Sequence, residues 1–108
     1  MKTHNLLQFT RGWFIGNFDP SLAKTEGFEV GIKQYKKGDV EEPHFHKVAQ
    51  EYTVIISGLF RINGKIYKKD SIINFEPNDI SHFECIKDGS TVVIKIPSVK
   101  GDKYVVKE

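Results

Sequence analysis

The stretch KKGDVEEPHFHKVAQEYTVIISG, residues 36–58, decides how the rest of the chain is interpreted. It holds two histidines one residue apart, His44 and His46, followed five residues later by Glu51. Side chains two apart on a β-strand project from the same face, so both imidazoles can converge on one ion. Glu51 can add a carboxylate if its strand runs beside the histidine strand. The pattern predicts a metal site, although an isolated pair of this kind is often only two surface histidines.

The composition places this site in one small domain. A chain of 108 residues is long enough for one hydrophobic core and too short for two. Its 16 basic and 14 acidic residues are spread along the chain, whereas a nucleic-acid surface needs clustering on one face. No run approaches the ~20 apolar residues of a membrane helix, and the single cysteine favours a reducing compartment. We therefore expect one cytoplasmic domain, residues 1–108, with no nucleic-acid or membrane partner.

Alternating apolar and polar residues between Gly, Asn, Asp and Pro turns predict an all-β chain. The Asn-Gly pair at 63–64 separates two strand-like runs and is a strong hairpin signal. A second hairpin is predicted at the Asp-Gly pair 88–89. Residues 20–27 are compatible with one helical turn, and residues 101–108 with an edge strand or a tail.

The spacing in the opening stretch is Gly38-x5-His44-x-His46-x4-Glu51-x6-Gly58, and it resembles the first motif of the cupin family at every fixed position. The second cupin motif, Gly-x5-Pro-x-Gly-x2-His-x3-Asn, resembles residues 71–86 in part. The match there lies at Pro77 and His82, and the departures are Ser71 and Asp79 at the glycine positions and Ile86 at the asparagine position.

The resemblance implies a double-stranded β-helix, a jelly-roll barrel of two antiparallel sheets, over the whole chain. It also implies a divalent transition metal held by His44, His46, Glu51 and His82. Imidazole and carboxylate ligands suit Fe(II), which we favour, and also Mn(II), Ni(II), Zn(II) or Co(II). A cupin that uses its histidines without a metal, or binds only an adventitious ion, is the alternative.

Strand parity extends the predicted site beyond the ligands. If His82 faces the cavity, Glu84 faces it too and is a candidate for proton transfer, while Phe83 and Cys85 point outward. The apolar alternation at residues 28–32 predicts that Phe28, Val30 and Ile32 point inward. The alternation in TVVIKI, residues 91–96, predicts that Lys95 points outward. A parity switch at residues 57–58 predicts a β-bulge.

The opposite faces of these strands carry many apolar side chains. Tyr52, Val54 and Ile56 alternate against the ligand side, which is more apolar surface than one small sandwich leaves in water. A homodimer is expected to cover it. The alternative is a packed layer formed by residues 6–18, whose Trp13 needs burial.

Three functions fit such a protein, because a fold with a metal does not name a reaction. The favoured one is an oxygenase acting on a small polar metabolite. The second is a non-redox isomerase, epimerase or lyase, with Glu84 or Tyr52 moving a proton. The third is a non-catalytic protein that binds a metabolite or a sugar.

Overall fold

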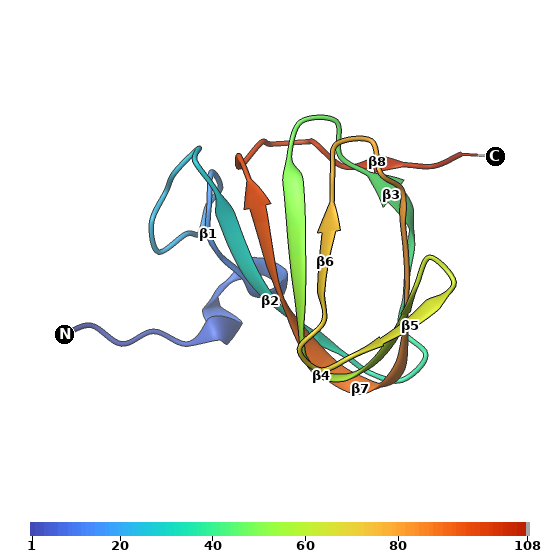
Figure 1. Cartoon of the computed structure of the whole chain (residues 1–108). Helices are drawn as coiled ribbons and strands as arrows, with labels where there is room; N and C mark the ends of the chain where they lie inside the picture. Colours follow the sequence, from blue (N-terminus) through green and yellow to red (C-terminus); the bar gives the residue numbers. More distant parts are fainter. Residues whose placement is uncertain (108) are drawn as a thin grey trace.

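In the computed structural model, which describes residues 1–107, the chain forms two facing layers of antiparallel strands (Figure 1). Two short 3-10 helices precede the strands, and no helix within the described residues is both long and apolar enough to span a membrane. The elements are η1 (Leu6–Gln8), η2 (Thr10–Gly12), β1 (Trp13–Ile15), β2 (Glu29–Tyr35), β3 (Val40–Phe45), β4 (Gln50–Ile62), β5 (Lys65–Lys68), β6 (Ile72–Phe75), β7 (Ser81–Ile96) and β8 (Tyr104–Val105).

The two longest strands, β4 and β7, connect the layers. The first half of β7 pairs with β3, and its second half pairs with β2. β4 likewise pairs with β6 through its first half and with β5 through its last residues, while it follows β7 along most of its length. Each long strand therefore contributes to both layers, and the predicted all-β jelly roll of two antiparallel sheets is confirmed.

The long strands bend where two glycines meet. Gly58 has a φ of +87°, and the register between β4 and β7 shifts around it, which confirms the predicted bulge. A Cβ atom on Gly89 would lie only 2.1 Å from the carbonyl oxygen of Ser57. The predicted hairpin at residues 88–89 is wrong, because β7 continues through this pair. Gly89 allows the backbones of β4 and β7 to approach each other closely, and it does not form a turn.

The shorter connections follow the sequence signals more closely. Asn63 and Gly64 both have positive φ and join β4 to β5, as predicted for an Asn-Gly hairpin. The C-terminal residues supply β8, which pairs with β3 as an edge strand. Residues 20–27 contain bends and no helical turn, so that expectation is wrong. The amide of Leu22 there donates to the carbonyl of Phe14, which ties the segment to β1.

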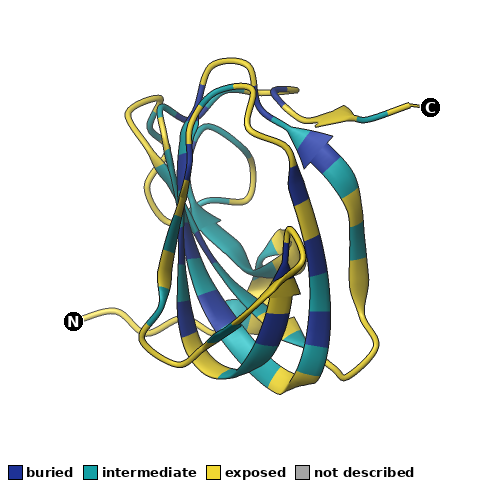
Figure 2. Ribbon diagram, turned by 45° about the vertical axis from the view of Figure 1, so that its right-hand side comes forward, coloured by how far each residue is buried: buried dark blue, intermediate teal, exposed yellow. Residues whose placement is uncertain are grey.

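Burial alternates in bands along the long strands (Figure 2). The apolar core fills one part of the space between the layers and consists of Ile55, Phe60, Ile62, Phe75, Phe83 and Cys85. Phe83 and Cys85 therefore point inward, opposite to the expectation. The expected inward set on β2 is wrong as well, because Lys33 and Tyr35 line the internal cavity while Phe28 is largely exposed.

Candidate metal centre

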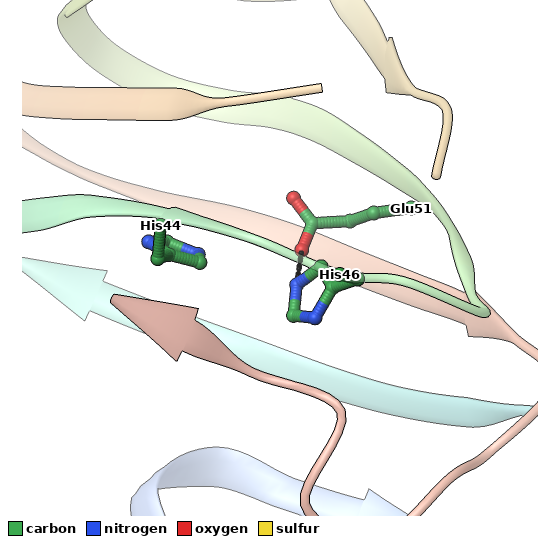
Figure 3. Close-up of side chains that lie close together, drawn as sticks. All are labelled: His44, His46 and Glu51. Atoms are coloured by element: carbon green, nitrogen blue, oxygen red, sulfur yellow. Dashed lines mark ion pairs between the residues drawn. The ribbon is translucent and has the colours of Figure 1, made fainter. Parts of the chain in front are cut away.

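Three of the predicted ligands meet at the polar part of the interior (Figure 3). His44 lies near the end of β3, His46 follows that strand directly, and Glu51 lies at the start of β4. Their relative exposures are 5%, 6% and 8%, and their potential ligand atoms all lie within 4.8 Å of one another. β3 pairs with the first half of β7, whereas the start of β4 pairs with its last residues. The short connection from β3 to β4 therefore brings ligands together from two layers.

Both imidazoles are held in one tautomer by backbone carbonyls. His44 Nδ1 donates to the carbonyl of Glu42 at 2.9 Å, and His46 Nδ1 donates to the carbonyl of Asp102 at 2.6 Å. A carbonyl oxygen only accepts hydrogen bonds, so the proton of each neutral ring lies on Nδ1 and its lone pair on Nε2. Hydrogen bonding of the second ring nitrogen is how proteins orient metal-binding histidines.

The surroundings of His46 Nε2 indicate whether these residues fit a metal ion. Its Nε2 atom is buried and has no hydrogen-bond partner among the described residues, and it lies 3.3 Å from Glu51 Oε1. A nitrogen lone pair facing a carboxylate oxygen is unfavourable unless a cation or a proton lies between them. Two imidazoles and a carboxylate are suitable ligands for a first-row divalent ion. The donor set therefore fits the predicted metal.

The electrostatic environment favours the metal-binding protonation states of His44 and Glu51. Burial lowers the pKa of His44, which favours its neutral form. Burial by itself raises the pKa of Glu51, but the adjacent His46 and the ammonium of Lys95 outweigh it and hold the pKa below its ordinary value. The Thr53 hydroxyl also donates to Glu51 Oε2 at 3.1 Å. A neutral imidazole and an ionised carboxylate are the forms that coordinate.

Asp102 supports the site and was not anticipated from the sequence. Its carboxylate accepts hydrogen bonds from the backbone amides of Lys47, Val48 and Ala49, at 2.9–3.2 Å. Burial by itself raises the pKa of Asp102, but the three amide hydrogen bonds outweigh this effect, so the net shift of the pKa is downward. Its carbonyl also fixes His46. No local pattern indicates this role, because the contact joins residues more than 50 positions apart.

The fourth predicted ligand, His82, does not join the other three. It is exposed on the outer side of β7, and its backbone amide donates to the side chain of Asn63. Ser81 is buried instead and pairs in register with His44. The reason is packing: Phe83 enters the apolar core, and a side chain one residue earlier must therefore face outward. The expected inward orientation of His82 is corrected accordingly.

The two predicted catalytic residues also lie outside the cavity. Glu84 is partly exposed and forms an ion pair with Arg61 on the outer side of the barrel. Tyr52 is half-buried on the outer face of β4, between the inward-facing Glu51 and Thr53. Neither side chain lines the cavity beside the metal ligands. The expectation for Glu84 depended on the orientation of His82, and Tyr52 is next to Glu51 in the sequence but points to the opposite face of β4.

A cavity of about 450 Å³ opens beside the three ligands. Its wall includes Lys95, which was expected to point outward but extends inward from β7. Tyr35 on β2 donates its hydroxyl to Glu41 Oε1 at 2.7 Å. Burial and the adjacent Glu41 carboxylate raise the pKa of Tyr35, so its hydroxyl stays protonated. The interior next to the metal centre is thus charged and hydrogen-bonding.

Several solved structures share this architecture, although no protein-family model and no curated protein matches the sequence. A Klebsiella pneumoniae protein with a double-stranded beta-helix domain superposes with a TM-score of 0.73 at 15% identity, covering 99% of this chain and 93% of its own. The DMSP lyase DddQ from Ruegeria pomeroyi has a TM-score of 0.72 at 11% identity, covering 87% and 49%. An RmlC-like cupin from Shewanella frigidimarina has a TM-score of 0.64 at 15% identity, covering 69% and 70%. Together with the strand pairing, these similarities show that the chain has the cupin fold.

Proposed function

We propose that this protein is a metal-dependent enzyme that acts on a small polar molecule, with the ion bound by His44, His46 and Glu51. The observation that carries the proposal is the buried contact between His46 Nε2 and the Glu51 carboxylate at 3.3 Å, which needs a cation or a proton between the two atoms. The adjoining cavity of about 450 Å³ is within the ordinary size range for a small-molecule site. A buried polar atom without a partner has a cost that a bound ion removes.

The favoured chemistry is that of an Fe(II) oxygenase. Two histidines and one carboxylate form the ligand set of many non-haem iron oxygenases, and this set leaves coordination positions open. When bound, the ion supplies Lewis acidity and, if it is redox-active, the electrons that oxygen chemistry requires. His44 and His46 contribute fixed Nε2 donors, because backbone carbonyls hold their Nδ1 protons.

Glu41 and Tyr35 are the groups best placed to move or hold a proton. Glu41 lines the cavity, and its Oε1 accepts a hydrogen bond from Tyr35 at 2.7 Å. A carboxylate held in this way can accept a proton from a bound substrate at its other oxygen, while the protonated Tyr35 fixes its orientation. These two residues replace Glu84 and Tyr52 as candidates for proton transfer.

A non-redox lyase or isomerase is the second candidate. One structurally similar protein is a DMSP lyase, and elimination needs a Lewis acid and a base but no oxidant. In this alternative, Glu41 would remove the proton, and an ion held by His44, His46 and Glu51 would supply Lewis acidity. The same residues therefore serve both reactions, and the dependence on metal and on oxygen distinguishes them.

The deciding experiment loads metal-free protein with Fe(II), Mn(II), Ni(II) or Zn(II) in turn and screens small polar metabolites with and without oxygen. We expect oxygen uptake with Fe(II) and none with Zn(II), because Zn(II) has no redox chemistry. Turnover with Zn(II) in the absence of oxygen would establish the lyase or isomerase. Ligand-induced thermal stabilisation without product under any condition would instead identify a binding protein.

A further inference from the structure

Trp13 lies in the cavity wall beside two lysines from adjacent strands. Its indole packs over Gly31 of β2, where an added Cβ atom would approach the ring to 2.7 Å. The ammonium nitrogen of Lys33 lies 5.1 Å from the centroid of this ring, and that of Lys95 lies 5.0 Å away. All three side chains line the cavity. The fold thus gathers two cations at one aromatic residue inside the protein.

Neither ammonium group has all of its hydrogen-bond donors satisfied by the described residues. Lys33 Nζ donates one hydrogen bond, to the carbonyl of Arg11 at 2.8 Å. Lys95 Nζ lies 4.0 Å from Glu29 Oε2, which is beyond hydrogen-bond distance. The other oxygen of Glu29 already accepts from the Ser98 hydroxyl at 2.9 Å. Since an ammonium group has three donors, both lysines retain donors that no described residue accepts, and both line the cavity.

The surroundings also disfavour the charged form of Lys33. Burial lowers the pKa of Lys33, and the charges of Arg11, Lys95 and Lys103 add to that effect. The Glu41 carboxylate raises the pKa of Lys33 and so opposes these effects. Its Oε1 also accepts a hydrogen bond from the Tyr35 hydroxyl. Like charges held together in a partly buried site destabilise the fold unless negative charge compensates them. Carboxylates in the cavity wall, such as Glu29 at 4.0 Å from Lys95, supply part of that compensation without a hydrogen bond to the ammonium, and a bound anion would add to it. The cluster therefore has the properties of an anion-binding site.

The position of Lys95 places this cluster next to the metal centre. Lys95 pairs in register with Glu51 on β4 and with Glu29 on β2, and all three side chains line the cavity. Side chains directly opposite on antiparallel strands have Cβ atoms only ~5 Å apart. An anionic group bound by Lys95 would therefore share one cavity with the metal ligands, on the strand adjacent to Glu51.

We propose that Lys33 and Lys95, together with Trp13, form a subsite for the carboxylate of a small organic acid, whose remaining atoms extend toward His44, His46 and Glu51. This deepens the proposed function by naming the substrate class, and it relies on that function only for the reaction that follows binding. Trp13 offers its ring to the carbon skeleton, and the lysines supply charge-assisted hydrogen bonds to the carboxylate.

A singly charged acid fits better than a phosphate. Glu29, Glu41 and Glu51 line the same cavity, so a ligand with two negative charges meets more repulsion there. Two ammonium groups are point charges on flexible stems and impose no bidentate geometry, unlike arginine. The site therefore selects by charge and size, which suits a compact monocarboxylate.

The test uses the fluorescence of Trp13, which is the single tryptophan of the chain. Full-length, metal-free protein is titrated at constant ionic strength with formate, lactate and benzoate, and in parallel with the corresponding neutral amides and inorganic phosphate. We expect at least one carboxylate to change the emission, and its amide to bind about tenfold more weakly or not at all. Calorimetric titration measures the same affinities independently of the indole.

Charge-removing variants complete the test. Lys33→Gln and Lys95→Gln should each weaken carboxylate binding by about tenfold, whereas Lys65→Gln, which removes an exposed charge on β5, should leave it unchanged. Equal binding of acid and amide by the unaltered protein would overturn the proposal without any variant. So would carboxylate binding that survives in the double variant, or tighter binding of phosphate.

The result is separable from the proposed function. Metal content measured on the same samples shows whether the three ligands bind an ion, and the titration requires neither metal nor turnover. Loss of carboxylate selectivity with a normal metal content would overturn the subsite alone. A protein that binds carboxylates but never retains a metal would overturn the proposed enzyme alone.

Discussion

The spacing of segments 38–58 and 71–86 resembles two motifs of the same family, yet only the first segment places its predicted ligands in the interior. In the first segment, His44, His46 and Glu51 are buried within reach of one ion. In the second, His82 is exposed and Ser81 lies inside. Spacing along a strand fixes which side chains share a face, but it does not fix which face turns inward.

The difference arises from what competes for the interior. Phe83 and Cys85 are largely or fully buried in the apolar core, and their burial commits the odd positions of β7 to the inside. In the first segment the competing side chain, Phe45, stacks on Tyr104 of β8 with ring centroids 5.5 Å apart. The C-terminal strand thus accommodates Phe45 outside, which leaves the inner positions to the histidines.

The largest expected effect separates the two segments directly. His46→Ala should reduce the metal content from about one first-row ion per chain to background, because it removes the donor that faces Glu51. His82→Ala is the matched control and should retain the metal. Elemental analysis of both purified variants provides the measurement. Equal metal loss in the two proteins would mean that His82 turns inward when an ion is bound.

The second effect concerns the support of the first segment by Asp102. Asp102→Ala should lower the free energy of unfolding by about 3 kcal/mol, because it leaves the buried amide of Ala49 and the partly buried amides of Lys47 and Val48 without their acceptor. Asp102→Asn keeps one acceptor oxygen and should lose less. Urea unfolding of the metal-free proteins measures both changes. Unchanged stability of the alanine variant would show that the C-terminal segment does not hold this connection in solution.

A smaller effect follows from the protonation of His44. Its pKa is lowered in the folded protein by burial, whereas the unfolded chain binds the proton near pH ~6.5. The unfolded state therefore binds more protons below that pH, so the stability of the metal-free protein should fall as the pH drops from about 6.5 through the folded pKa. Urea unfolding at several pH values checks this, and His44→Gln should reduce the slope. An identical slope in the variant would assign the pH dependence to other groups.

The smallest effect is expected on the outer side of β7. Glu84→Gln removes the ion pair with Arg61, in which both side chains are more than one third exposed, and should change stability by less than about 1 kcal/mol. Metal content and turnover should stay the same, because Glu84 does not line the cavity. A strong loss of activity in this variant would restore Glu84 as a catalytic residue.

The parity of β2 and of the second half of β7 is also reversed, but for a different reason from that of His82. Apolar alternation normally marks the side facing the core, and it placed Val30 and Ile32 inside. The structure turns Lys33 and Tyr35 inward, because this part of the interior is a polar cavity and not a packed core.

Tyr52 and Val54 pair in register with Ile94 and Val92 on the outer face of the sheet. Whether a second copy covers that face remains a prediction.

The sequence alone determined the all-β class, the hairpin at residues 63–64, the bulge at residues 57–58 and the grouping of His44, His46 and Glu51, and the resemblance to the cupin motifs implied the jelly-roll topology. These features depend on local signals: strand period, turn residues with positive φ, and ligands within eight residues of one another. The tertiary structure alone decided that His82 lies outside, that Lys95 lies inside, and that Asp102 supports His46. Those outcomes depend on which distant side chains compete for the interior and on contacts across the whole chain, and no local pattern encodes either.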